Sequence, residues 1–184
     1  MSPASHPLKP DGMSLILKAL EFAAQKHRDQ RRKDKDASPY INHPIQLANV
    51  LRQEGGVADP VVIAAALLHD TLEDTETTWQ ELRGEFGDEI ANIVQEVTDV
   101  QWLKKIVRKR LQVAKARHAS IAARLVKLAD KICNLRDVAA RPPASWSLER
   151  RREYFEWAKE VVDKLRGTHP GLERKFDDAY ALKP

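Results

Sequence analysis

The sequence is poor in cysteine: Cys133 is the only one among 184 residues. A single cysteine excludes both an intrachain disulfide framework and a zinc cluster built from several thiolates. Long apolar runs are also missing, since none approaches the roughly 20 residues that a membrane-spanning helix needs. The first 14 residues contain no apolar stretch of the kind found in secretory signals. Together these features favour a cytoplasmic protein with no membrane partner.

A strong excess of one charge is missing as well. The chain has 31 Lys and Arg against 27 Asp and Glu, which gives a formal net charge of +4. No basic helix is interleaved with aromatic residues in the way of a single-strand binding platform, so we expect no nucleic-acid partner. A small anionic substrate such as a nucleotide accounts for the basic excess, and ordinary solvated surface accounts for it equally well.

Helical periodicity, in contrast, runs through almost the whole chain. Residues 61–70 (VVIAAALLHD) are apolar on every side, which predicts the central buried helix. We find no internal repeat and no interior linker. We therefore expect an all-α fold, a single helical bundle over residues 13–184, preceded by a disordered tail over residues 1–12. The expected helices cover residues 13–28, 44–54, 60–70, 79–86, 88–98, 104–115, 120–138, from Ser145 or Ser147 to 166, and from 170 onwards, with a loop at 71–78.

Two histidines and two aspartates have the chemistry of metal ligands. His69 and Asp70 end the most apolar helix, where a charged group is rarely buried without a partner. His43 lies at another expected helix start, and Asp130 lies inside an amphipathic helix, where aspartate has poor intrinsic propensity. A lone His-Asp pair is also compatible with a simple helix cap. A mixed set of imidazoles and carboxylates suits one Mn²⁺, with Fe²⁺ or Zn²⁺ as alternatives.

Acidic and basic residues follow the expected ligands along the chain. Glu73 and Asp74 come three and four residues after Asp70, and a carboxylate pair beside a metal can orient or deprotonate water. An acidic loop of no catalytic role has the same appearance. A basic loop that includes Arg32 and Lys33 leads into His43, and guanidinium groups bind phosphate well; a solvated charge run is the alternative.

With these residues in view, the sequence resembles the HD-domain superfamily of metal-dependent phosphohydrolases. The order His43, His69-Asp70 and Asp130 matches the characteristic ligand order of that superfamily. Longer segments are similar to the hydrolase domain of RelA/SpoT alarmone enzymes, and above all to the stand-alone small alarmone hydrolases that also occur in animals. The resemblance covers residues 14–180. It rests on the segments FAAQKHRDQRRKD, YINHP, AALLHDTLEDT, FGDEIANIVQEVTD and KLADKICNLRD.

The resemblance implies an enzyme that removes the 3′-pyrophosphate of ppGpp and pppGpp to give GDP or GTP. It implies one Mn²⁺ held by the four ligands above, and water activation or positioning by Glu73 and Asp74. It also implies substrate contacts, which we expect from Arg32, Lys33, Lys105, Asn134, Arg150 and Tyr154. Two other functions stay open: a phosphatase for another nucleotide such as NADPH, and a nucleotide-sensing module without turnover. The sequence does not predict an oligomeric state.

Overall fold

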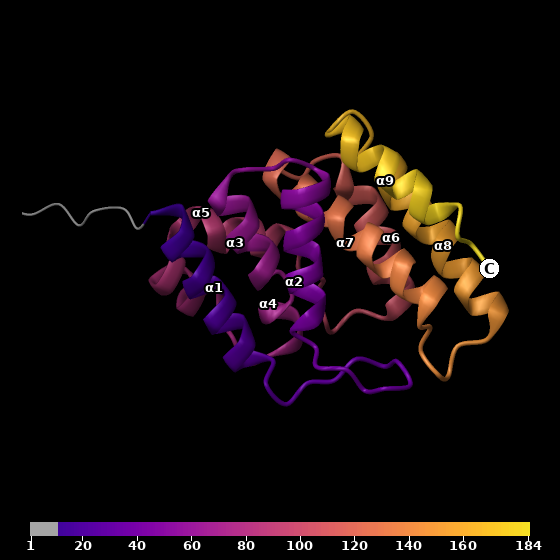
Figure 1. Cartoon of the computed structure of the whole chain (residues 1–184), viewed down its shortest axis with the longest axis horizontal. Helices are drawn as coiled ribbons and strands as arrows, with labels where there is room; N and C mark the ends of the chain where they lie inside the picture. Colours follow the sequence, from indigo (N-terminus) through magenta and orange to yellow (C-terminus); the bar gives the residue numbers. More distant parts are fainter. Residues whose placement is uncertain (1–10) are drawn as a thin grey trace, which may run out of the picture.

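A computed structural model describes residues 11–184, and this part of the chain contains helices and no strand, which confirms the all-α prediction (Figure 1). An isolated bridge between Arg31 and Pro39 closes the loop after the first helix. No helix in residues 11–184 has the length and apolar character needed to cross a membrane. The helices are α1 (Gly12–Lys26), α2 (Asn42–Asn49), α3 (Pro60–Leu68), α4 (Thr71–Asp74), α5 (Trp79–Val97), α6 (Lys105–Ala116), α7 (Ile121–Ala140), α8 (Leu148–Asp163) and α9 (Pro170–Tyr180), with a π-helical turn, η1 (Val50–Glu54), directly after α2.

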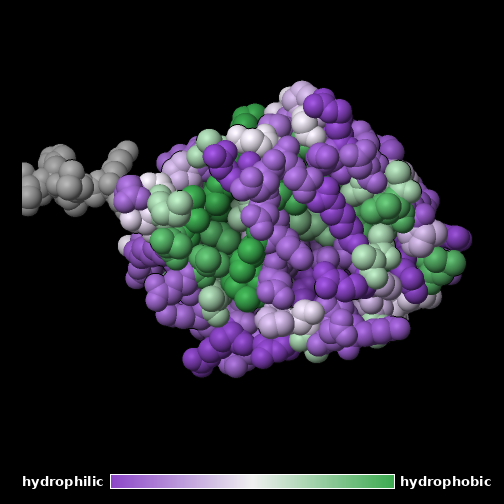
Figure 2. Space-filling view, viewed as in Figure 1, coloured by the Kyte–Doolittle hydropathy of each residue, from purple (hydrophilic) through white to green (hydrophobic). Residues whose placement is uncertain are grey.

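The apolar helix α3 lies at the centre, as its sequence predicts. Asp59 caps α3 by accepting the backbone N–H of Val61, and Pro60 occupies the first turn, where its missing N–H is not needed. Seven of its residues are buried, and α1, α2, α5 and α7 all pack against it. Figure 2 shows hydrophobic surface over α1 and between α1 and α2. The exposed hydrophobic residues of these two helices are Met13 and Leu17 of α1 and Ile45 of α2.

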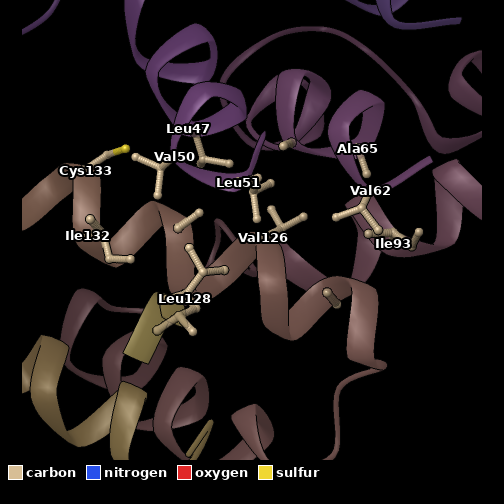
Figure 3. Packing of buried hydrophobic residues seen from close by; sticks show 14 of the residues in the cluster. Leu47, Val50, Leu51, Val62, Ala65, Ile93, Val126, Leu128, Ile132 and Cys133 are labelled. Carbon is tan, nitrogen blue, oxygen red and sulfur yellow. The ribbon is translucent and has the colours of Figure 1, made fainter. Parts of the chain in front are cut away.

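The longest helix, α7, forms the second half of the core. Ser120 caps it by accepting the N–H of Ala123. The buried face of α7 packs against α2 and η1 on one side and against α8 and α9 on another. Figure 3 shows side chains of α2 and η1 pointing at this face of α7. In that view Leu47, Val50 and Leu51 face Val126 and Cys133 of α7, whereas Leu128 and Ile132 lie on the opposite side of α7. Because α3 packs against both α2 and α7, these three helices lie together.

Helix boundaries follow the sequence closely, with a few corrections. Gly87 breaks the helical geometry inside α5 with φ +85° and ψ 170°, at the place where the sequence predicts one helix to end and another to begin. The acidic segment 71–78 does not start as a loop: its first four residues form α4, where the carbonyl of Asp70 accepts the N–H of Asp74 at 2.9 Å. The helix after Ser147 ends at Asp163, three residues earlier than expected.

The disordered tail expected over residues 1–12 falls mostly outside the described residues, because the structure describes the chain from residue 11. Its last two residues correct the boundary. Asp11 accepts the backbone N–H of Ser14 at 2.9 Å and so caps α1, and Gly12 is the first residue of that helix. A capped helix end is ordered by its own hydrogen bonds, so residues 11 and 12 belong to the folded part of the chain.

Candidate metal centre and active site

Three helices bring the two histidines and two aspartates to one place. His43 is in the first turn of α2, His69 follows the last residue of α3, Asp70 precedes α4, and Asp130 is in the middle of α7. His43 Nε2 lies 3.3 Å from Asp130 Oδ1, and His69 Nε2 lies 4.0 Å from the same oxygen. One ligand atom each of His43, His69 and Asp130 lies within 4.8 Å of the others. This spacing is compatible with one shared cation.

The hydrogen bonds of the two imidazoles fit a metal ion. His69 Nδ1 lies 2.9 Å from the carbonyl of Ala66. A carbonyl only accepts, so Nδ1 carries the proton, and in the neutral ring Nε2 presents a lone pair to the site. That Nε2 is buried and faces carboxylate oxygens, with Asp70 Oδ2 at 2.8 Å and Asp130 Oδ1 at 4.0 Å. A nitrogen lone pair among acidic oxygens is an arrangement that suits a bound cation.

Asp70 stands beside this group of three ligands. Its Oδ2 lies 2.8 Å from His69 Nε2 and also accepts a hydrogen bond from the Tyr40 hydroxyl. Asp70 is not among the three residues whose ligand atoms lie within 4.8 Å of one another. Its assignment as a fourth ligand therefore stays a prediction.

Opposite charges hold the site ionised. Burial by itself raises the pKa of Asp70, but the facing imidazoles of His69 and His43 outweigh it and hold that pKa well below its usual range. The pKa of Asp130 is lowered in the same way, by the Lys131 ammonium and the two imidazoles against burial. Burial lowers the pKa of His69, and the charges of Asp70 and Asp130 reverse this and raise it to about 9. In the metal-free protein, the proton on His69 therefore supplies positive charge next to the carboxylates of Asp70 and Asp130, as a bound cation does in the metal-loaded protein.

Glu73 and Asp74 have different surroundings although they are adjacent in α4. Glu73 is half-buried, accepts the backbone N–H of Asp99 at 3.0 Å, and has Arg108 Nη1 at 3.5 Å from its other oxygen. Burial and the nearby charges of Asp70, Asp99 and Asp74 outweigh the Asp99 hydrogen bond and raise the pKa of Glu73 to about 7. Asp74 is exposed and accepts from Gln30 Nε2 at 3.0 Å. A carboxyl group that titrates near neutrality has the property required of a general base.

Three adjoining cavities contain all the site residues that the sequence predicts. The metal-site cavity, of ≈ 250 Å³, is lined by Arg32, His43, His69, Asp70, Glu73, Lys105, Asp130, Asn134 and Tyr154. A larger loop-side cavity, of ≈ 580 Å³, is lined by Lys33 and Asp74 and shares Arg32, His43, Asn134 and Tyr154 with the first. The α8 cavity, of ≈ 210 Å³, is lined by Arg150 and shares Lys105 and Tyr154. The structure therefore brings these residues together, and their contacts with a substrate stay predictions.

The basic loop is ordered by its own hydrogen bonds. The N–H of Arg32 donates to the carbonyl of Ser38 at 2.8 Å, and the N–H of Tyr40 donates to the carbonyl of Gln30 at 3.1 Å. The Arg32 guanidinium forms an ion pair with Asp137 of α7 and lies 5.8 Å from the Tyr40 ring. The side chain of Lys33 is exposed at the loop-side cavity. The loop is thus a fixed wall of the cavity.

Cations and aromatic rings alternate where α6 faces α8. Trp146 lies between the Arg150 guanidinium, at 4.6 Å from its ring centre, and Lys105 Nζ, at 5.9 Å. The Tyr154 ring centre lies 5.3 Å from that of Trp146, with the two rings tilted at 55°, and burial raises the pKa of Tyr154 to about 12. Burial and the like charges of Arg150, Arg108 and Lys33 lower the pKa of Lys105. Positive charges crowded in this way favour an anion between them.

A family comparison agrees with this geometry. The profile described as HD domain matches residues 19–156, which is more than half of the chain. The chain belongs to the HD-domain family. Within that family it is similar to proteins named guanosine-3′,5′-bis(diphosphate) 3′-pyrophosphohydrolase. The Xenopus tropicalis protein is 54% identical over 167 residues, which cover 91% of this chain and 93% of the relative. The human protein is 55% identical over 165 residues, covering 90% of this chain and 92% of the relative.

A solved structure is similar to this HD domain over nearly its full length. It is described as a metazoan ortholog of SpoT that hydrolyses ppGpp and plays a role in starvation responses. Its TM-score is 0.89 at 44% identity, with 97% of each chain covered. These findings confirm the resemblance inferred from the sequence, including its closeness to the small hydrolases of animals.

The sequence reasoning missed two residues of this HD domain that touch the expected ligands. Tyr40 donates its hydroxyl to Asp70, and Lys131 Nζ lies 2.8 Å from Asp130 Oδ2. Each is close in sequence to a ligand, Tyr40 three residues before His43 and Lys131 directly after Asp130. Position along the chain was the only available signal, because the Tyr40–Asp70 contact joins separate segments and the burial of Lys131 depends on how α7 packs against α8.

Proposed function

We propose that this protein hydrolyses the 3′-pyrophosphate of guanosine tetraphosphate and pentaphosphate, giving GDP or GTP and pyrophosphate. The observation that carries the proposal is the match of more than nine tenths of this chain to relatives of that name. The clustered ligands and the cation-lined cavities support it. We further propose residues 13–184 as one catalytic domain, and the cytoplasm as its location, since the single cysteine is buried and free.

The resident metal is, in our proposal, one Mn²⁺ held by His43, His69, Asp70 and Asp130. The imidazole and carboxylate donors suit Mn²⁺ or Fe²⁺, and also permit Zn²⁺. Bound there, a divalent ion supplies Lewis-acid activation of water and neutralises charge on the phosphoryl oxygens. The buried Nε2 of His69, which faces the carboxylates of Asp70 and Asp130, supports this assignment.

Glu73 is the residue we assign to proton transfer. In hydrolysis, the oxygen of water joins the phosphorus next to the ribose 3′ oxygen, and the bond between that phosphorus and the 3′ oxygen breaks. Glu73 takes the proton that the attacking water loses, and the 3′ oxygen gains a proton as it leaves. The backbone N–H of Asp99 donates to one Glu73 oxygen at 3.0 Å, so the other oxygen, 3.5 Å from Arg108 Nη1, keeps a fixed direction. The raised pKa of Glu73, about 7, suits both halves of this transfer.

The remaining residues hold the nucleotide in our proposal. Arg32, Lys33 and Asn134 line the loop-side cavity, the largest of the three, which we assign to the nucleoside. Lys105 and Arg150, with Tyr154 between the metal-site and α8 cavities, are placed for the phosphate groups.

A nucleotide panel tests the substrate and the reaction together. The protein is incubated with Mn²⁺ and ppGpp, pppGpp, NADPH or a deoxynucleoside triphosphate, and pyrophosphate and orthophosphate are measured separately. We expect pyrophosphate and GDP from ppGpp, and no product from Asp130→Ala. Orthophosphate from NADPH alone would favour the phosphatase alternative. Tight ppGpp binding without any product would favour the sensing module.

A further inference from the structure

The two oxygens of Asp130 have different partners. Oδ1 faces the metal centre: it lies 3.3 Å from His43 Nε2 and 4.0 Å from His69 Nε2. Asn134, one helical turn later on α7, donates to this oxygen at 2.5 Å. Oδ2 is turned away from the imidazoles and lies 2.8 Å from Lys131 Nζ. One carboxylate thus presents a single oxygen to the site and gives the other to a lysine.

Lys131 is buried deeply for a charged residue. It is 4% exposed, and its Nζ lies 4.6 Å from the ring centre of Trp157 on α8. An ammonium is costly to bury unless it is paired, and Asp130 is the carboxylate with which it forms an ion pair. The Trp157 ring is itself fixed, because its indole N–H donates to the carbonyl of Lys109 at 3.2 Å. Neither member of the pair can turn away without leaving a buried charge.

We propose that Lys131 is a positioning residue that keeps Asp130 a one-oxygen ligand of the metal. A carboxylate can bind a metal through one oxygen or through both, and chelation by both takes an extra coordination position. The ion pair to Oδ2 prevents that chelation. The position kept open is available to water or to a phosphate oxygen of the substrate. The inference rests on the proposed metal-dependent function and concerns metal hydration, whatever the nucleotide.

A lysine on the same helix provides a matched control. Lys127 is one turn before Lys131 on α7 and is 7% exposed. Its Nζ donates to the backbone carbonyl of Val97 at 3.2 Å. Lys127→Met therefore removes a buried ammonium of the same chemistry without releasing Asp130 Oδ2. A change seen in Lys131→Met and absent from Lys127→Met belongs to the Asp130 contact.

The test counts exchangeable waters on bound Mn²⁺ by water-proton relaxation, with full-length protein and no nucleotide. In Lys131→Met we expect about one water fewer than in the wild type, because Asp130 is free to chelate. Metal affinity or turnover should also change by about 10–100-fold, as is typical when a contact behind a ligand is lost. Lys131→Arg, which keeps a cationic donor, should restore the water count, and Lys127→Met should leave it at the wild-type value.

An unchanged water count in Lys131→Met, with metal bound and the helical circular-dichroism spectrum intact, would overturn the proposal. An equal loss of bound water in Lys127→Met would also overturn the proposal, because the loss would then follow from removing any buried ammonium of α7 and not from releasing Asp130 Oδ2. If Lys131→Met does not fold, Lys131→Leu gives the same reading with a smaller side chain. A wild-type protein that binds Mn²⁺ with the expected waters but does not hydrolyse ppGpp would instead contradict the proposed substrate. The failure of the Lys131 proposal and the failure of the proposed function are therefore distinguishable.

Discussion

At the residue scale, Glu73 and Asp74 divide the work that the sequence gives to both. Glu73 lines the metal-site cavity and is anchored by the Asp99 N–H, whereas Asp74 lines the loop-side cavity and is exposed. Glu73→Gln keeps size and hydrogen bonding and removes the base, so kcat should fall by about 10²–10⁴-fold. Asp74→Asn should lower kcat by less and change KM more. Steady-state kinetics with bound Mn²⁺ measured in parallel checks this. If Glu73→Gln and Asp74→Asn lowered kcat by the same factor, Asp74 would also take part in the proton transfer.

The pKa of Glu73 has a consequence for the stability of the metal-free protein. Its value of about 7 in the folded state lies above the ordinary 4.5. A raised carboxyl pKa means that the folded state binds the proton more tightly, so stability is present below pH 4.5 and is lost as pH rises through 7. Glu73→Gln cannot ionise and should be more stable than wild type at pH 8, by on the order of 1–3 kcal/mol. Urea unfolding of both proteins at pH 4.5 and pH 8 measures this. A Gln variant less stable at both pH values would contradict it.

At the element scale, two cations of the basic loop, Arg32 and Lys33, have different surroundings. Arg32 joins the loop to α7 through Asp137, while the Lys33 side chain is exposed. Lys33→Ala should raise KM and leave the unfolding free energy within about 0.5 kcal/mol of wild type. Arg32→Ala should raise KM and also lower stability by about 1–3 kcal/mol, because Asp137 loses a charged hydrogen bond. Kinetics and thermal unfolding of both variants decide the assignment. A wild-type KM in both would make the loop ordinary solvated surface.

Helix α5 depends on one glycine and tolerates change at another. Gly87 has φ +85° and ψ 170°, a region that only glycine adopts easily, so Gly87→Ala should cost about 1–3 kcal/mol of stability. Gly84 lies in the same helix, is exposed, and has nothing within 4 Å of an added Cβ. Gly84→Ala should therefore stabilise the protein by about 0.5–1 kcal/mol. Denaturant unfolding gives both values, and a stabilising Gly87→Ala would show that the break is dispensable.

At the scale of the whole molecule, the helical spacing of apolar residues predicts most of the helices and points to part of the site. The apolar segment before His69 predicts α3 and its burial, and the oddity of an aspartate inside an amphipathic helix draws attention to Asp130. Two features could not be predicted in this way, because periodicity within one helix does not show how segments pack. They are the contact of the Tyr40 hydroxyl with Asp70 and the burial of the Lys131 ammonium between Asp130 and the Trp157 ring of α8.

The metal centre also couples the stability of the whole fold to pH. In the metal-free protein the pKa of His69 is about 9, above its ordinary 6.5. The sign is that of a base that gains partners on folding: the contribution is complete below pH 6.5 and is lost as pH rises through 9. Above that pH the carboxylates of Asp70 and Asp130 lose the positive charge of the His69 imidazolium beside them. The metal-free protein should therefore lose on the order of 1–3 kcal/mol between pH 6.5 and pH 9.5.

A bound divalent ion replaces that proton, and a ligand that binds only the folded state stabilises it. The melting temperature with Mn²⁺ should thus exceed that with a chelator, and the gap should widen from pH 6.5 to pH 9.5. Thermal unfolding by circular dichroism, with Mn²⁺ or with EDTA across this range, measures the gap. Asp130→Ala is the control, because removal of one ligand should abolish most of the metal effect at every pH. A gap that stays constant with pH in the wild type would mean that the proton on His69 and the metal do not compete for the same nitrogen.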